Sequence, residues 1–300
     1  MELAYSSTLP YAPAEATPPA AATHATHCLN CEVALTGPYC AQCGQSAGTH
    51  RITMGHLLHD IPHTIWHVDK GLFFTLRELL LRPGAVVLGY LRGQRVRYFA
   101  PLSLLLLVLG ISGLLAVKLH TGELAQNLNA TRSSELQQVQ LKTTNMLLDY
   151  MKWFYVVLAP LAGWVVRRTL RRAHLNWAEA IVAVLYVTTG STLLTILPMP
   201  LLYWFRSPEA YGRLTLLVAL LTFGYQGWAY GQLLLDTTLN RFGRWWRGLF
   251  AAITTYLLII FSTLAFSFAV HWPAWKSAFH HEAERQRALH PRPSAHAPRP

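Results

Sequence analysis

Charged residues are scarce in this sequence, and most of the few that occur are basic. Only 13% of the 300 residues are Asp, Glu, Lys or Arg, whereas a soluble globular domain carries about 25%. The 14 acidic residues are outnumbered by 25 Lys and Arg, which gives a formal net charge of +11. The chain therefore has too few ionic side chains to cover the surface of an ordinary soluble protein of this length.

Basic residues are also missing from the N-terminal stretch. Residues 1–27 contain neither Lys nor Arg and are rich in Ala, Pro and Thr. A secretory signal needs a charged start followed by an apolar core, so we expect no cleaved export signal here. The composition instead predicts a disordered tether.

Apolar residues make up 52% of the chain. A bilayer core about 30 Å thick needs about 20 apolar residues of helix, and five runs reach or approach that length. These runs are residues 98–118, 147–166, 179–204, 214–235 and 248–272. We therefore predict an all-α integral membrane bundle, residues 98–272, with about five transmembrane helices. Pro198 and Pro200 are expected to break or kink the third run near one interface.

The basic residues predict an orientation. They cluster before the first run, after the second run and after the fourth run, whereas the other connections carry few or mixed charges. Because cytoplasmic loops carry the excess of Lys and Arg, this alternation places the N-terminus in the cytosol and the C-terminus outside. The tail, residues 273–300, is itself basic and is expected to be disordered. If the third run is a hairpin, the last two spans invert and this tail is cytosolic.

Cysteine is absent everywhere except in one short polar segment. Cys28 and Cys31 form one CxxC knuckle, and Cys40 and Cys43 form another. Two such knuckles suit a tetrahedral Zn²⁺, and a closed set of four thiolates leaves no open position for catalysis. We predict a zinc ribbon at residues 28–45 whose metal is structural.

Three alternatives to zinc stay open for this segment. Disulfides need an oxidising compartment, which the predicted cytosolic location does not provide. A redox CxxC needs a βαβ context, and an iron–sulfur centre also uses four cysteines.

Gly44 follows the second knuckle, where a positive φ is often needed, and Glu32 takes the equivalent place after the first.

Residues 46–97 combine histidines, apolar residues and arginines. Four histidines would share one face of a continuous helix and could bind a second metal or sense pH. They are His56, His59, His63 and His67. Pro62 interrupts that helix, so an interfacial helix with its histidines toward headgroups or solvent is the simpler interpretation.

The second half of this segment predicts two amphipathic helices in the inner membrane interface. Leucines on one face of the first helix lie opposite Arg77 and Glu78, and Pro83 with Gly84 ends it. The leucines are Leu72, Leu76, Leu79 and Leu80. Three arginines follow the second helix and are candidate contacts for anionic lipid or phosphate. They are Arg92, Arg95 and Arg97.

Three features of the sequence together resemble a bacterial family of zinc-ribbon-headed membrane proteins, known as domain of unknown function 3667. They are the cysteine head, the segment "DKGLFFTLRELLLRPG" and the segment "YLRGQRVRYFAPLSLLLL". The resembling stretch runs from about Cys28 to Pro101. The resemblance implies an architecture and, with the predicted spans, a place in the bacterial cytoplasmic membrane. It implies no activity, substrate or catalytic residue.

We expect a non-enzymatic protein whose cytosolic zinc ribbon docks a protein partner, as a scaffold, sensor or assembly factor. The ribbon is small, so residues 50–97 are expected to share the contact. A transporter for a neutral or lipidic solute is the first alternative, using polar patches at Thr188–Thr192 and Gly224–Gln232. Close helix packing is the simpler interpretation of both patches. The second alternative function is an interfacial lipid-modifying enzyme that uses the histidines. Nucleic acid is not an expected partner, because the knuckles carry no basic or aromatic reading surface.

Overall fold

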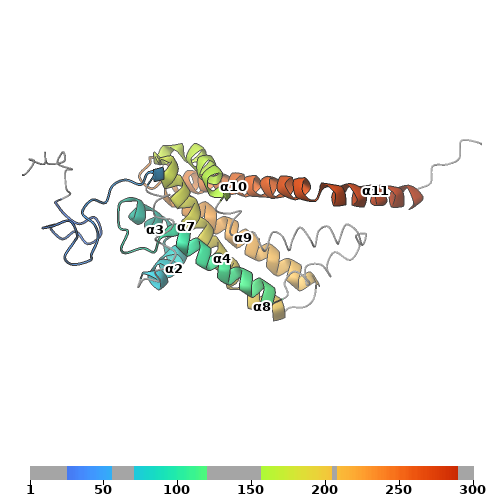
Figure 1. Ribbon diagram of the computed structural model, residues 1–300, viewed down its shortest axis with the longest axis horizontal. Helices are drawn as coiled ribbons and strands as arrows, with labels where there is room; N and C mark the ends of the chain where they lie inside the picture. The colour runs from blue at the N-terminus through green and yellow to red at the C-terminus, as the bar shows by residue number, and fades with distance from the viewer. Residues whose placement is uncertain (1–25, 56–70, 120–156, 205–207, 290–300) are drawn as a thin grey trace, which may run out of the picture. The chain divides into compact units, whose positions relative to one another are not determined.

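The computed structural model describes residues 26–55, 71–119, 157–204 and 208–289 (Figure 1). The chain divides into two compact units between His50 and Arg51. The described part of the first unit contains the cysteine head. Its backbone is held by isolated β-bridges, His27 with Ala34 and Tyr39 with Ser46, and residues 26–50 form no longer strand.

The described part of the second unit is helical, which confirms the predicted all-helical body for these residues. The helices are α2 Leu72–Leu81, α3 Pro83–Leu91, α4 Pro101–Lys118, α7 Trp177–Ile196, α8 Met199–Trp204, α9 Pro208–Gln232, α10 Arg241–Val270 and α11 Trp272–Leu289 (Figure 1). A further helical stretch at 157–169 is followed by the one-turn helix η1, Arg171–Ala173.

Helix α7 is the centre of this unit, since α2, α3, α4 and α9 all pack against it. Its residues are buried without interruption from Ala178 to Val187. A helix that is apolar on all sides must be enclosed by other helices or by lipid. A capping box starts it: the Asn176 side chain accepts from the Glu179 N–H at 2.9 Å, and the Glu179 carboxylate accepts from the Asn176 N–H at 2.8 Å.

Two helical segments are long and apolar enough to cross a membrane, Trp177–Leu201 and Arg241–Val270. The first is largely buried inside the protein and the second is largely exposed. The first contains the turn at 197–198 that separates α7 from α8, near the break predicted at Pro198. Among the described residues, α4 and α9 are not candidate spans by this test, and Pro101–Ala116 of α4 is a shorter apolar helix. The predicted run 147–166 lies partly outside the described residues. Membrane insertion of these three runs stays a prediction.

The apolar faces of α2 and α3 are covered by protein, which differs from their predicted exposure to a membrane interface. Leu79, Val86 and Val87 are fully buried, and Leu72 is nearly so. Both helices pack against α7, and α3 also packs against α9. Two of the four leucines predicted for the apolar face of α2 are buried, Leu72 and Leu79, whereas Leu76 and Leu80 are half-buried. Hydrophobic periodicity could not identify what buries this face, because neighbouring helices and lipid are equally apolar.

The break between α2 and α3 leaves two backbone groups without helical partners, and α9 supplies both partners. Pro83 has no N–H, so the Leu79 carbonyl lacks its usual donor. The Tyr225 hydroxyl donates to this carbonyl at 2.7 Å instead. The Gly84 N–H donates to the side-chain oxygen of Gln232 at 2.8 Å. The same break therefore fixes the α2–α3 pair onto α9.

The turn before α4 is held in a similar way. The Phe99 N–H donates to the Thr75 hydroxyl at 2.9 Å, and the Phe99 carbonyl accepts from the Tyr186 hydroxyl at 2.7 Å. All three residues are buried. Because an unpaired buried backbone group is costly, these bonds favour one path for the chain between α3 and α4.

Glycines bring α9 and α10 close together, and these two helices form the most extensive helix pair. A Cβ added to Gly248 would lie 2.1 Å from the Gly227 carbonyl oxygen and 2.6 Å from the Gly231 nitrogen. Small residues four apart allow such backbone contact between helices. Within the polar patch at Gly224–Gln232, Gly227 and Gly231 therefore serve packing, which agrees with the simpler of the two interpretations of the patch. In the other patch, the hydroxyls of Thr189 and Thr192 donate to carbonyls of their own helix.

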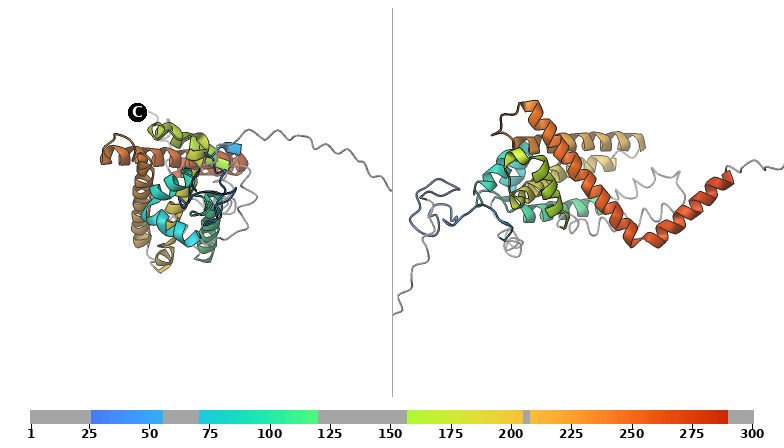
Figure 2. Two further views of the ribbon diagram at one scale, coloured as in Figure 1. Left: turned by 90° about the vertical axis from the view of Figure 1, so that its left-hand side faces the viewer. Right: turned by 90° about the horizontal axis from the view of Figure 1, so that it is seen from above.

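The C-terminal segment differs from its prediction. We expected disorder from residue 273 onward, but Trp272–Leu289 forms helix α11, which meets α10 at an angle (Figure 2). Pro273 explains the angle because proline cannot continue the preceding helix. Residues 274–289 contain no Pro or Gly and several strong helix formers. Residues 290–300 and most of the predicted tether, 1–25, lie outside the described residues.

Candidate metal centre

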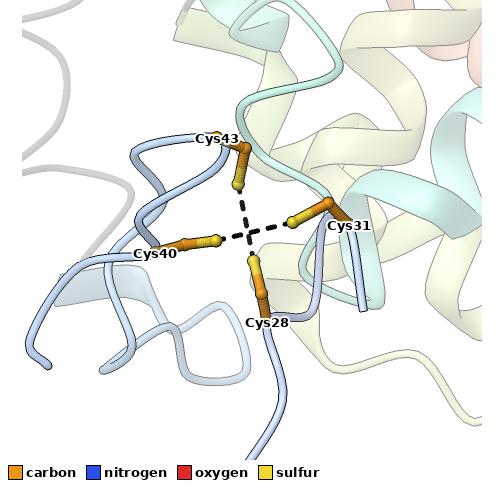
Figure 3. A group of neighbouring side chains, drawn as sticks. All are labelled: Cys28, Cys31, Cys40 and Cys43. Atoms are coloured by element: carbon orange, nitrogen blue, oxygen red, sulfur yellow. Dashed lines mark hydrogen bonds between the residues drawn. The ribbon is translucent and has the colours of Figure 1, made fainter. Parts of the chain in front are cut away.

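The four cysteine sulfurs point toward one common centre (Figure 3). All four Sγ atoms lie within 4.8 Å of one another. Two pairs, Cys28 with Cys43 and Cys31 with Cys40, are 3.5 Å apart. A tetrahedral Zn²⁺ with Zn–S bonds of about 2.3 Å has edges of about 3.8 Å between sulfurs. The four thiols are free, and their spacing fits the coordination shell of a metal ion.

The two knuckles share one backbone geometry, twelve residues apart. In each, the N–H of the first cysteine donates to the carbonyl five residues later, and its carbonyl accepts from the N–H four residues later. These bonds are Cys28 with Val33 (2.8 Å) and Glu32 (2.9 Å), and Cys40 with Gln45 (2.8 Å) and Gly44 (2.9 Å). The head is therefore an internal repeat in which each copy supplies two ligands.

The residue after each second cysteine has a positive φ. The angle is 75° at Gly44 and 63° at Glu32. Glycine adopts this left-handed conformation at little cost, whereas a residue with a Cβ is strained there. The first knuckle therefore holds the same shape as the second with a less suitable residue.

The thiols have unequal tendencies to ionise. Backbone N–H groups of Cys43 and Gln42 stabilise the thiolate of Cys40 and lower its pKa to about 6. For Cys31, the backbone of Val33 lowers the pKa, but burial and the neighbouring sulfurs of Cys40, Cys43 and Cys28 outweigh it and raise the pKa to about 12. Four thiolates this close repel one another, so a bound cation is needed to hold all of them deprotonated.

The arginines predicted to contact lipid are already engaged within the protein. Arg92 lies 3.4 Å from a carboxylate oxygen of Asp236. The Arg97 guanidinium lies over the rings of Phe74, at 5.1 Å, and Tyr98, at 5.8 Å. Arg95 also has an interaction partner. The Arg92 side chain is 66% exposed in its ion pair, so contact of these three arginines with anionic lipid stays a prediction. The four histidines of the predicted stripe lie within 56–70, outside the described residues.

Sequence analysis missed an ion pair at the start of the second unit. Arg51 donates to both carboxylate oxygens of Glu179, at 2.5 and 2.7 Å, and to the His174 carbonyl at 3.2 Å. Asn176 donates to the carbonyl of Ile52 at 2.9 Å. These bonds attach residues 51 and 52 to the start of α7. An Asn followed by a Glu three residues later is a local pattern typical of a helix start, but no local pattern relates either residue to residue 51.

Comparison with known proteins yields one finding. No curated protein and no solved structure matches this chain. One family model does match, over a stretch that begins after the cysteine head and includes α2, α3 and part of α4. It covers the α2–α3 break and the turn around Phe99. Residues 69–113 match the family described as "Protein of unknown function (DUF3667)", which confirms the family predicted from this segment.

Proposed function

We propose that this chain is a non-enzymatic, multi-pass membrane protein whose cysteine head holds a structural Zn²⁺ and docks a cytosolic protein partner. The observation that carries the proposal is the convergence of four sulfurs in a closed set. Four protein ligands complete a tetrahedral shell and leave no position for a reacting water. Such a site builds a small folded surface and does not act on a substrate.

The membrane part of the proposal has about five spans in the bacterial cytoplasmic membrane, with the head on the cytosolic side. It is supported by the two long apolar helical segments and by the exposure of α10. Phe261, near the middle of the apolar part of α10, is 68% exposed. An exposed apolar surface of this kind marks a contact with a membrane or with another protein, and the length of the apolar segment favours lipid. The basic clusters between the apolar runs support the orientation.

The docking role is supported by the surface of the head. Leu29, Val33 and Tyr39 are exposed although they are apolar or aromatic. A metal replaces the core in so small a unit, so these side chains are not needed for folding and are available to a partner. A scaffold, a sensor and an assembly factor all use a surface of this kind.

The metal content is tested first on the full chain, purified from membranes. Elemental analysis is expected to find about one Zn²⁺ per chain, and none in the variant Cys40→Ser/Cys43→Ser. Thr36→Ser, an exposed change between the knuckles, is the matched control and should retain the metal. A wild-type chain without bound metal contradicts the proposal.

Docking is tested by placing a photo-crosslinking amino acid at Tyr39, which is 66% exposed. A discrete protein adduct is expected in intact cells, and the adduct should disappear when Cys40 and Cys43 are both changed to Ser. A crosslinker at Lys276 in α11, outside the head, should not form this adduct. If the adduct survives loss of the thiols, the head does not dock the partner.

A further inference from the structure

A strongly basic pocket lies beside the start of α10. Its cavity of about 480 Å³ is lined by Arg168, Thr169, Arg171, Trp246, Arg247 and Phe250. Small-molecule sites measure about 300–1,000 Å³, so this space admits a headgroup-sized ligand. Three of the six lining residues are arginines and none is acidic. Its arginines come from the basic clusters after the second and fourth apolar runs, and they are separate from the candidate lipid contacts at Arg92, Arg95 and Arg97.

The lining selects an anion with several oxygens. Three arginine side chains line one cavity without an acidic residue among its lining, and an anion bound there offsets the repulsion between their like charges. The planar fork of arginine matches phosphate oxygens in a two-point bond. The pocket therefore favours a phosphate group over a neutral polar ligand.

An exposed apolar stripe continues along α10 from the mouth of this pocket. Its residues recur at spacings of three and four, which places them on one face of the helix. They are Trp246, Phe250, Ile253, Leu257, Phe261 and Leu264, and each is at least 41% exposed. From Phe250 to Leu264 the stripe runs for about 20 Å at 1.5 Å per residue. That length exceeds one leaflet of a bilayer core about 30 Å thick.

We infer that this pocket binds the phosphate of an anionic phospholipid, with its acyl chains along the stripe of α10. A cationic site joined to an apolar track is complementary to an amphiphile, and a soluble phosphate would leave the track unused. Trp246 stacks on Phe242, with ring centroids 6.4 Å apart, and aromatic rings beside a basic site are typical of the boundary between headgroups and acyl chains. The inference rests on the membrane placement proposed above.

The test uses the full chain, purified in a neutral detergent and stripped of lipid. Native mass spectrometry is used to titrate it with phosphatidylglycerol, with phosphatidylcholine and with inorganic phosphate. We expect a saturable phosphatidylglycerol adduct, and Arg168→Gln/Arg171→Gln/Arg247→Gln should weaken that binding by about tenfold or more. Arg172→Gln/Arg285→Gln/Arg287→Gln removes the same charge from outside the pocket and should change binding less than twofold.

Three results would overturn the inference. Equal weakening by both triple variants would show non-specific attraction, and equal binding of phosphatidylcholine would show that charge is not recognised. Displacement of the lipid by inorganic phosphate at similar concentrations would assign the pocket to a soluble anion.

Unchanged thermal unfolding of the variants confirms that they fold, and Arg247→Lys, which keeps the charge, should bind with intermediate affinity. A chain that purifies without detergent refutes the membrane placement itself, so the two failures are distinguishable.

Discussion

At the residue scale, the two knuckles of the head place residues with and without a Cβ in the same left-handed backbone conformation. Gly44 and Glu32 occupy equivalent positions and both have positive φ. A residue with a Cβ in this region is destabilised by about 1–2 kcal/mol. Because a metal-built unit folds as the metal binds, that strain lowers metal affinity.

Glu32→Gly is therefore expected to strengthen metal binding. The gain is partly offset by the larger entropy that glycine loses on folding, so about 0.5–1 kcal/mol is expected, a few-fold in affinity. Gly44→Ala should weaken binding by about 1 kcal/mol. Chelator competition on the full chain measures both, with Gly37→Ala, where the added Cβ meets nothing within 4 Å, as the neutral control. Weaker zinc binding by Glu32→Gly would contradict the argument.

A second residue-scale prediction concerns Tyr225. Tyr225→Phe removes the donor to the buried Leu79 carbonyl while keeping the ring, so we expect the free energy of unfolding to fall by about 1–3 kcal/mol. Tyr256→Phe removes a hydroxyl from a half-exposed tyrosine and should lower the free energy of unfolding by less. Denaturant unfolding followed by circular dichroism compares the two. An equal loss of stability in both variants would show that the hydrogen bond to the Leu79 carbonyl contributes no more than the hydroxyl of Tyr256.

At the element scale, the pairing of α9 with α10 depends on the absence of side chains at the contact. Gly248 lies against backbone atoms of Gly227 and Gly231. Backbone cannot rotate away as a flexible side chain can, so any added atom must separate the helices. Not every glycine of the bundle carries this constraint, because a Cβ on Gly110 of α4 would meet nothing within 4 Å.

We expect Gly248→Ala to destabilise the protein by about 1–3 kcal/mol. Gly110→Ala, the matched control, should be neutral or stabilise it by up to about 1 kcal/mol, because alanine favours helix. Thermal unfolding in detergent gives both values. If the two variants unfold alike, the contact between α9 and α10 is looser than its geometry indicates.

At the scale of the whole molecule, two units with different sources of stability share one chain. The head, within Met1–His50, has few buried apolar residues and depends on its four thiols. The helical unit, Arg51–Pro300, has a continuous apolar core around α7. Apolar burial therefore stabilises the second unit, and under the proposed function a metal bound by the four thiols stabilises the first.

Metal removal is expected to unfold the head alone. After chelation, protease should cut between Thr26 and His50, while the helical circular dichroism signal and the thermal midpoint of the helical unit stay unchanged. Zinc added back should restore protection. Loss of helical signal on chelation would show that the units do not fold separately.

Local features of this protein could be predicted from sequence because the information lies within a few residues. The CxxC spacing predicted which four side chains meet, and the break at Pro83 and Gly84 predicted where α2 ends. The apolar face of α2 was assigned in part, since Leu72 and Leu79 are buried and Leu76 and Leu80 are half-buried. Helix α11 was missed because the composition of 273–300 as a whole masked a helix-forming stretch at 274–289.

Only the tertiary structure decided which distant groups satisfy one another. Tyr225 with Leu79, Tyr186 with Phe99 and Arg51 with Glu179 each join residues more than eighty positions apart. A lost backbone partner at a proline is visible in sequence, but the side chain that replaces it is selected by packing in three dimensions. For the same reason, three arginines from two separated segments form one pocket that no linear pattern predicts.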